Sequence, residues 1–264
     1  MHTLLKIIGY TIIDQLRQKS FVVLLGISVL LVMLIRSCYN GNYMVNGAQV
    51  DSLNIAWHTS LIAFQVIAVG MYLMISMMAM KIFTRDLDDG STILFLSKPI
   101  DRWQYVAGRI VGTWLLSFAF MFVLHLTIFC ITWSKTGGII PGYLTGSLIC
   151  AANLLFVIVC VCLLSLYLPD FISALTTMGA LFFGLILDGW QVLSASMPGI
   201  GVAQHPPFWK IVYPKVFMVQ AWANAVISGE QFNNIGPINP LVNVTLWALL
   251  IFALLIVTFN KKEI

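Results

Sequence analysis

"FTRDLDDGSTILFLSKPIDRWQYVAGR", residues 83–109, separates the two long apolar stretches that decide the fold. These 27 residues carry eight of the chain's 24 charged side chains. The flanking stretches, about 57–83 and 105–133, are mostly apolar, and each is long enough to cross a bilayer as a helix. The contrast predicts two membrane-spanning helices joined by a compact charged loop.

The composition of the whole chain excludes a water-soluble globular protein. Of the 264 residues, 60% are hydrophobic and only 9% are charged, which leaves too little polar surface to cover a globule. The apolar runs do not alternate as strands of an outer-membrane barrel would. We therefore expect an all-α integral membrane protein in which residues 1–264 form one transmembrane domain.

Six membrane-spanning helices are expected along the chain. Their approximate ranges are 20–36, 57–83, 105–133, 143–168, 171–187 and 241–259. The segment 188–240 contains six prolines and apolar clusters too short to cross a bilayer. For this outer segment we expect short re-entrant or interfacial helices, near 191–197 and 215–228.

Residues 3–19 have the pattern of an amphipathic helix. Leu5, Ile8, Ile12 and Leu16 recur at helical spacing, and charged residues such as Asp14 occupy other positions. This pattern predicts a helix that lies in the membrane interface and leads into the first span. A soluble cap helix is the alternative interpretation.

The distribution of basic residues predicts the orientation of the chain. An even number of spans places both termini on one side, which would hold ten of the Lys and Arg residues against four on the other. By the positive-inside rule, both termini and the loop at 83–109 are cytoplasmic.

The charged loop has its own helix signals. Asp88 or Asp89 is suited to cap a short helix, Pro99 would end it, and Asp101 with Gln104 resembles a capping box at the start of the next span. Four consecutive apolar residues, 93–96, need a protein partner on one side. We expect a cytoplasmic helix over about 86–98, and packing against its own bundle is the alternative to a separate partner.

The order of residues in this loop resembles that of ABC transporter permeases of the ABC-2 type. In that family the loop between spans two and three typically reads Glu, Gly-Thr, an apolar run, Pro-Ile-Ser-Arg and Gly-Lys. Here Asp86 and Asp89 stand near the usual Glu, residues 90–92 form the Gly-Ser-Thr step, and "SKPIDR" and Gly108-Arg109 follow. The stretch "IIGYTIIDQLRQKSFVVLL" resembles the elbow helix of the same family, so the resemblance covers essentially the whole chain.

The resemblance implies a permease in the bacterial cytoplasmic membrane, paired with a second copy or a paralogue and carrying two ATP-binding subunits. The cytoplasmic helix would be the coupling helix, seated in a groove of the ATPase. Phe95 and Leu94 are the expected anchors, and Gly90 would permit a turn or a close backbone approach. Arg102 is expected to pair with the ATPase, or else with Asp101, Asp86 or a lipid phosphate. The expected contact residues are Asp86, Asp89, Gly90, Thr92, Leu94, Phe95, Pro99 and Arg102.

The chain contains no Gly-x-x-x-x-Gly-Lys-[Ser/Thr] phosphate loop. We therefore expect no enzyme and no bound cofactor or metal; ATP and Mg would be bound and hydrolysed by the partner subunit. No nucleic-acid partner is indicated. His58 and His125 as haem ligands are disfavoured, because no second pair and no attachment motif accompany them.

Three polar residues in the predicted spans are candidates for an intramembrane polar path. They are His125, Asn153 and Asp188. For the first two, a hydrogen-bonded packing group between helices is the favoured interpretation.

Three hypotheses about function remain open at this stage. The first is the permease of an ATP-driven exporter. The second is a subunit that relays ATPase-driven motion to an outer-side accessory protein and translocates nothing itself. The third is an assembly or scaffold subunit that has no ATPase.

Overall fold

The computed structural model describes residues 2–261 except 39–43, 46–47, 50–51, 89, 91–100, 197–211, 233 and 235–237. The described part is helical apart from one pair of two-residue strands. The elements, in chain order, are α1 (His2–Arg17), α2 (Lys19–Cys38), β1 (Met44–Val45), β2 (Ala48–Gln49), α3 (Ser52–Ala79), α4 (Ile82–Asp88), α6 (Arg102–Thr136), α7 (Tyr143–Ser165), α8 (Asp170–Ser196), α10 (Val216–Ser228) and α11 (Pro240–Lys261).

Five stretches of helix are long and apolar enough to cross a membrane. They are Ile55–Asp86, Arg102–Thr136, Tyr143–Ser165, Asp170–Trp190 and Pro240–Lys261. Thr3–Arg17 and Phe21–Ser37 form a bent pair, with an angle of 69° between them, which gives a sixth candidate. The all-α membrane fold predicted from the sequence is therefore confirmed.

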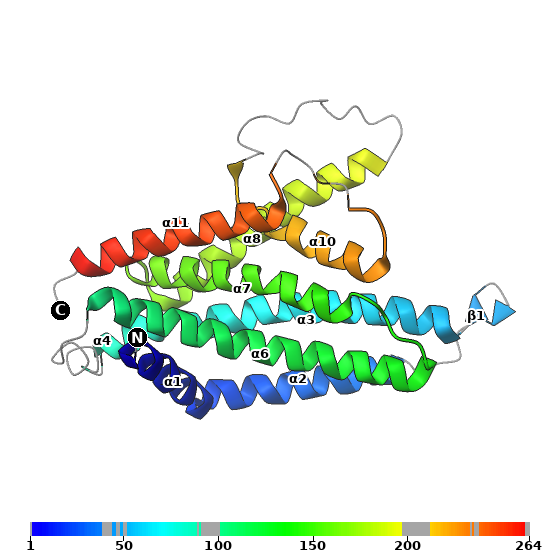
Figure 1. The fold of residues 1–264 in the computed structure, drawn as a ribbon, viewed down its shortest axis with the longest axis horizontal. Helices are drawn as coiled ribbons and strands as arrows, with labels where there is room; N and C mark the ends of the chain where they lie inside the picture. The colour runs from blue at the N-terminus through cyan, green and yellow to red at the C-terminus, as the bar shows by residue number, and fades with distance from the viewer. Residues whose placement is uncertain are drawn as a thin grey trace.

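The helices lie side by side in an elongated bundle (Figure 1). The start of α1, α4, the start of α6 and the end of α11 lie at one end, and β1 lies at the other. The two strands pair antiparallel, with Met44 opposite Gln49. The first and last described helices thus meet at the same end, as an even number of spans requires.

Helix α7 is the centre of the bundle, with α3, α6, α10 and α11 packed around it. Its side chains are mostly apolar on all faces, as expected of a buried helix. Cys150, Leu154, Val157 and Val161 have no exposed surface. Over the most apolar part of the candidate spans, 56% of α7 is buried but only 17% of α8. The core therefore lies around α7, and α8 sits at its margin.

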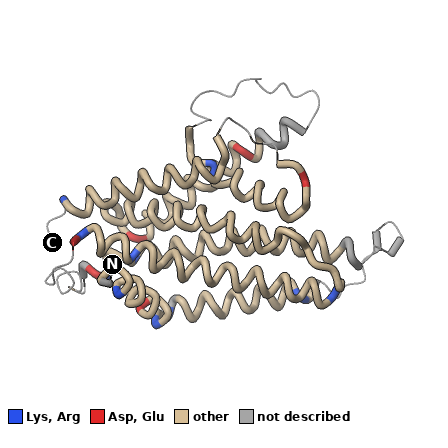
Figure 2. Tube along the Cα trace, viewed as in Figure 1, with Lys and Arg blue, Asp and Glu red and all other residues tan. Residues whose placement is uncertain are grey.

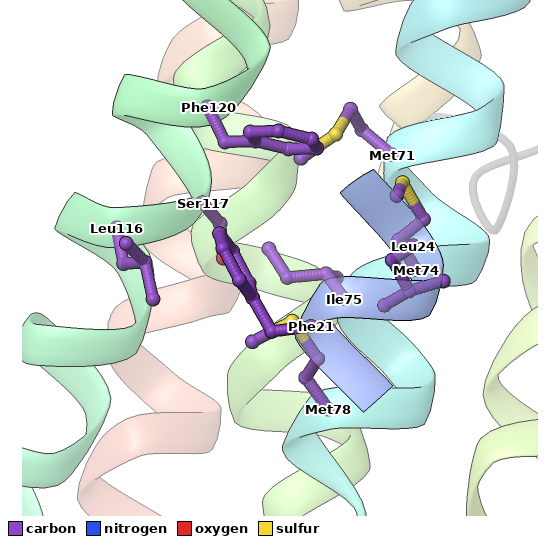
Figure 3. Close-up of a pocket in the computed structure, with 9 residues that line it drawn as sticks. All are labelled: Phe21, Leu24, Met71, Met74, Ile75, Met78, Leu116, Ser117 and Phe120. Atoms are coloured by element: carbon purple, nitrogen blue, oxygen red, sulfur yellow. The ribbon is translucent and has the colours of Figure 1, made fainter. Parts of the chain in front are cut away.

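Helix α2 packs on α3 and α6 through methionine and aromatic side chains (Figure 3). Met71, Met74 and Met78 of α3 face Phe21 of α2 and Phe120 of α6 around a cavity of about 10 Å³. The two phenylalanine rings are 5.7 Å apart. Flexible thioethers can fill an irregular gap of this kind, so α2 is held by dispersion contacts.

Of the two short helices predicted in the later part of the chain, the structure has one as a separate helix. The helix expected near 215–228 is present as α10. In place of a separate helix over 191–197, α8 continues without a break to Ser196. The stretch 188–196 contains one glycine, Gly189, and no proline, and one glycine costs about 1 kcal/mol, which a long helix tolerates.

Candidate functional site

The first helix is packed closely on the start of α6 at two glycines. A Cβ atom at Gly108 would lie 2.6 Å from Cγ2 of Ile7, and one at Gly112 would lie 2.8 Å from Cβ of Thr11. The pair forms a Gly-x-x-x-Gly step, which lets helix backbones approach in membrane proteins. Gln15 then donates a 2.6 Å hydrogen bond to Thr113 Oγ1. These contacts fix α1 against α6.

A cluster of four charged side chains joins α1, α4 and α6 beside these glycines. The guanidinium of Arg109 pairs with Asp86, and its Nη1 lies 3.5 Å from Oδ2 of Asp14. Arg85 Nη2 lies 2.8 Å from Oδ1 of the same Asp14. We call Asp14, Arg85, Asp86 and Arg109 the charged joint. Each of the three helices contributes at least one member.

Tyrosine rings enclose the charged joint. Tyr105 donates a hydrogen bond from its hydroxyl to Asp86. The centre of the Arg109 guanidinium lies 5.3 Å from the ring centroid of Tyr10 and 5.8 Å from that of Tyr105, within the range of cation–π attraction. Phe83 and Phe259 pack around Tyr105, with centroids 6.3 and 5.8 Å from its ring. Through Phe259, α11 also contacts this end.

Burial makes the charges of the joint interdependent. Only 3% of the Arg109 side chain and 6% of the Asp86 side chain are exposed. A buried charge is tolerated when a partner and hydrogen bonds compensate its lost hydration, and removing one partner of a buried pair costs about 3–5 kcal/mol. Figure 2 shows that charged residues gather at this end of the bundle, while the middle of the long helices is free of them in the described chain. The ion pairs therefore hold the three helices together at this end.

Comparison with protein families decides the class of the chain. The family described as "ABC-2 family transporter protein" matches residues 5–264. The chain belongs to the ABC-2 transporter family. Members of this family are membrane subunits of ABC transporters, and they associate with ATP-binding subunits. No curated protein matched the sequence in a search.

The charged joint of this ABC-2 chain lies next to the predicted coupling helix. Residues 86–88 of that helix are the end of α4, while Asp89 and 91–98, with Thr92, Leu94 and Phe95, lie outside the described residues, as does Pro99. Asp86 is buried in the joint, where Arg109 and Tyr105 bind its carboxylate. The structure therefore gives Asp86 an internal partner.

Gly90 and Arg102 are the other predicted contact residues that the structure describes. Gly90 is in a turn with φ of 67°, a left-handed conformation that favours glycine. Among the described residues, no atom lies within 4 Å of the position a Cβ would take there, so the turn is the feature of the described chain that favours a glycine, and close approach of a partner stays a prediction. Arg102 Nη1 donates a 3.2 Å hydrogen bond to the carbonyl of Asn260, which links the start of α6 to the end of α11.

The three candidates for a polar path lie in different surroundings in the ABC-2 chain. His125 Nδ1 lies 2.9 Å from Ser147 Oγ, and its ring stacks on Phe64. Asn153 donates to the Tyr72 hydroxyl over 2.8 Å and to the Val216 carbonyl over 3.0 Å. Each of these two residues thus joins helices as a packing group, and the polar path stays a prediction.

The third candidate, Asp188, is 1% exposed near the end of α8. It accepts a hydrogen bond from Tyr213. The pKa of Tyr213 is raised above its usual value mainly by burial and, to a smaller extent, by this hydrogen bond. Trp247 Nε1 donates a 2.5 Å hydrogen bond to the carbonyl of Val212. The chain that follows residues 197–211 is thus tied to both α8 and α11.

The sequence does not indicate that Asp14, Arg85 and Arg109 meet. Asp14 is one of the charged residues away from the apolar face of the first helix, Arg85 lies in the charged loop, and Arg109 follows Gly108 in the step that resembles the family's Gly-Lys. The Gly-x-x-x-Gly step at 108–112 was the available signal for a helix contact. In the described part of the chain, no group of three or more His, Cys, Asp or Glu side chains is placed to hold a metal ion.

Proposed function

We propose that this chain is the permease subunit of an ATP-driven exporter in a bacterial cytoplasmic membrane, and that the charged joint transmits the motion of its ATP-binding subunits. The single observation that carries the proposal is the buried pair of Asp86 and Arg109, which together with the half-buried Asp14 joins α1, α4 and α6. The substrate would cross between this chain and a second copy or a paralogue. Both termini would face the cytoplasm.

The position of the joint in the sequence suits this role. The segment that resembles a coupling helix is bounded by α4 on one side and by α6 on the other. Asp86 ends the apolar stretch before the segment, and Arg109 stands two turns into the helix that follows it. A displacement of the segment by an ATPase would act on both flanking helices at once, and Arg109 would hold them in a fixed relation.

The elbow-like α1 would take part in the same motion. Its Asp14 contacts arginines of both flanking helices, and its backbone lies against Gly108 and Gly112. Leu5, Ile13 and Leu16 are exposed on α1, as expected of a helix whose outer face lies in the membrane interface. Motion of the joint would thus turn α1 together with α2, which continues from it at a bend of 69°.

Purification of the chain from its native membrane with the bound ATP-binding subunit tests the contact. Phe95→Asp places a charge in the predicted anchor of the coupling helix, and we expect it to abolish recovery of the ATPase. Trp103→Asp is the control, because it adds the same negative charge at an exposed position just beyond the segment and leaves the anchor unchanged. Equal recovery of the ATPase with Phe95→Asp and with the unmodified chain would contradict the proposal.

The alternative is a mechanical relay to an outer-side partner, and the contacts just before and at the start of α10 favour it. Tyr213 binds Asp188 of α8, the Lys215 amide donates to Asn243 Oδ1 over 3.1 Å, and Trp247 binds the Val212 carbonyl. These contacts secure the chain beside 197–211 to two spans. A stable outer protein in the purified complex, lost on deletion of 199–209 while the ATPase is retained, would favour the relay. Its absence would favour the exporter.

A further inference from the structure

Helix α8 is hydrogen-bonded to other parts of the described chain near its two ends. At its start, Thr84 Oγ1 of α4 donates a 3.0 Å hydrogen bond to Oδ2 of Asp170. Near its end, the Tyr213 hydroxyl donates to Asp188. The hydroxyl groups between these two points donate to carbonyl oxygens of α8 itself; they belong to Ser173, Thr176 and Thr177. In the described chain, polar contacts thus secure the ends of α8, and apolar packing holds the length between them.

The packing along the middle of α8 is loose. Over the most apolar part of each span, 17% of α8 is buried, against 50% of the stretch Ile55–Asp86. Residues of α8 between Thr176 and Leu187 also line two cavities, of about 330 and 360 Å³. Side chains beside a cavity lack part of their dispersion contacts. The attachment of α8 to the bundle therefore depends strongly on its ends.

Thr84 lies on α4 between the charged joint and α8. It directly precedes Arg85 and Asp86, two members of the joint. Successive residues of an α-helix are turned by about 100°, so Thr84 and Asp86 point to nearly opposite sides of α4. Asp86 is bound to Arg109 of α6, whereas Thr84 is bound to Asp170 of α8. Helix α4 therefore connects the joint to the start of α8.

The two sides of α4 are connected with different strength. On one side, Asp86 and Arg109 form a buried ion pair. On the other, Oδ1 of Asp170 is buried and has no hydrogen-bond partner among the described residues. Thr84 Oγ1, which has one proton to donate, also lies 3.3 Å from the Met80 carbonyl. A single shared hydrogen bond is weaker than a buried ion pair, so a displacement of α4 breaks the contact with α8 first.

We propose that Thr84 and Asp170 form a latch. The hydrogen bond holds α8 against α4 while the ATP-binding subunits are without nucleotide, and it breaks when ATP binding moves α4 together with the charged joint. The latch rests on the proposed function, because the ATP-binding subunits supply this motion. The two residues are positioning residues that restrain a helix, and release of α8 is the step that they control.

Distances between spin labels in the purified complex with its ATP-binding subunits test the latch. One copy per complex carries labels at exposed Trp103 of α6 and Phe182 of α8. With the latch intact, we expect a non-hydrolysable ATP analogue to change this distance. Thr84→Val keeps the shape of the side chain without its hydroxyl, and we expect the nucleotide-free distance to shift toward the value with the analogue. ATP hydrolysis should become several-fold faster, because α8 no longer has to be released.

Matched variants separate a latch from a general loss of stability. Thr84→Ser retains the hydroxyl and should restore the unmodified distance. Thr176→Val removes a hydroxyl that donates to the Ile172 carbonyl of its own helix, and it should leave the distance unchanged. A shift with Thr176→Val equal to that with Thr84→Val would overturn the latch.

Removal of the acceptor tests the same bond from the other side. Asp170→Ala should shift the distance as Thr84→Val does, and the double variant should shift it no further. A larger shift in the double variant would assign the effect of Thr84→Val to its bond with the Met80 carbonyl and overturn the latch. Asp170→Ala also replaces Thr84→Val if the complex with Thr84→Val cannot be purified.

Failure of the latch and failure of the proposed function give different results. If the analogue changes the distance in the unmodified chain but Thr84→Val leaves the nucleotide-free distance unchanged, the latch is wrong and the proposed function stands. If Thr84→Val instead prevents the change caused by the analogue, the contact pulls α8 along with α4, and the latch is wrong. If the analogue does not change the distance in the unmodified chain, the proposed function fails and the latch fails with it.

Discussion

The bundle is held by two polar networks of different chemistry. The charged joint at the end near α4 joins α1, α4 and α6 by ion pairs. Deeper in the bundle, Tyr72, Asn153 and Gln220 join α3, α7 and α10 by hydrogen bonds between neutral groups. Both networks connect helices far apart in the sequence, but only the first carries charge.

The difference follows from the cost of charge in a membrane. An ionised side chain at the bilayer centre is expensive, whereas neutral amides and hydroxyls need only a hydrogen-bond partner. The charges therefore gather where the chain leaves the bilayer, beside the loop that an ATPase would contact. The neutral network holds the middle of the bundle, and under the proposed function the charged joint would receive the force of the ATPase.

The largest expected effect comes from removing the central cation. Arg109→Leu leaves the buried Asp86 without its ion pair, and we expect the free energy of unfolding to fall by about 3–5 kcal/mol. Asp86→Leu added to Arg109→Leu should recover part of the loss, because Asp14 keeps Arg85. Titration with SDS measures the free energy of unfolding of the single and the double variant, and Arg17→Leu, at an exposed position, is the control. A double variant less stable than the single one would contradict this account.

Separating α1 from α6 should cost less. Gly112→Leu places its Cβ 2.8 Å from Thr11 Cβ and 3.0 Å from the Ile8 carbonyl, and overpacking of this kind costs about 1–3 kcal/mol. The same titration measures it. Gly70→Leu on α3 is the matched control, since no atom lies within 4 Å of its Cβ position. Equal losses in the two variants would show that the contact of α1 with α6 adds no stability.

The neutral network predicts a smaller loss. Asn153→Leu removes the hydrogen bonds to Tyr72 and to the Val216 carbonyl. Side-chain hydrogen bonds between membrane helices are worth about 0.6–1.7 kcal/mol, which is the expected fall in the free energy of unfolding. Thr127→Val, at a half-buried position of α6 where the hydroxyl bonds only within its own helix, serves as the control. A loss as large as that of Arg109→Leu would remove the distinction between the two networks.

Removal of Arg85, the most exposed member of the charged joint, should lower the free energy of unfolding least. The Arg85 side chain is 40% exposed, and exposed ion pairs contribute about 0–1 kcal/mol. Arg85→Leu also leaves Asp14 paired with Arg109. We expect a loss below about 1 kcal/mol, together with a weaker dependence of stability on salt than in the unmodified chain. A loss above that of Gly112→Leu would place the centre of the joint at Arg85.

The sequence predicted the fold well where hydrophobic length decides it. The spans around α3, α6, α7 and α11 were expected within a few residues, and α10 within one. The first helix shows the limit of such patterns. Its apolar positions Leu5 and Leu16 are exposed, while Ile7, Thr11 and Gln15 face α6. In a membrane protein the apolar face of a helix can meet lipid, so hydrophobicity does not show which face meets protein.

The charged joint could not be predicted because its pairs lie far apart in the chain. Asp14 and Arg85 are 71 residues apart, and local spacing carries no information about such a contact. Charge alone placed Arg109 in the cytoplasmic loop, whereas burial beside Asp86 follows from the packing of α1 at Gly108 and Gly112. A pair of glycines one turn apart was the part of this arrangement visible in the sequence.

Distance measurement between spin labels tests the central claim most directly. Labels are attached at exposed Ile13 of α1 and Trp103 of α6 in the complex with its ATPase, and a second pair joins Trp103 to exposed Phe182 of α8. The account predicts that ATP leaves the distance from α1 to α6 unchanged and alters the distance from α6 to α8. A change of the distance from α1 to α6 on ATP binding in the unmodified chain would contradict a rigid joint.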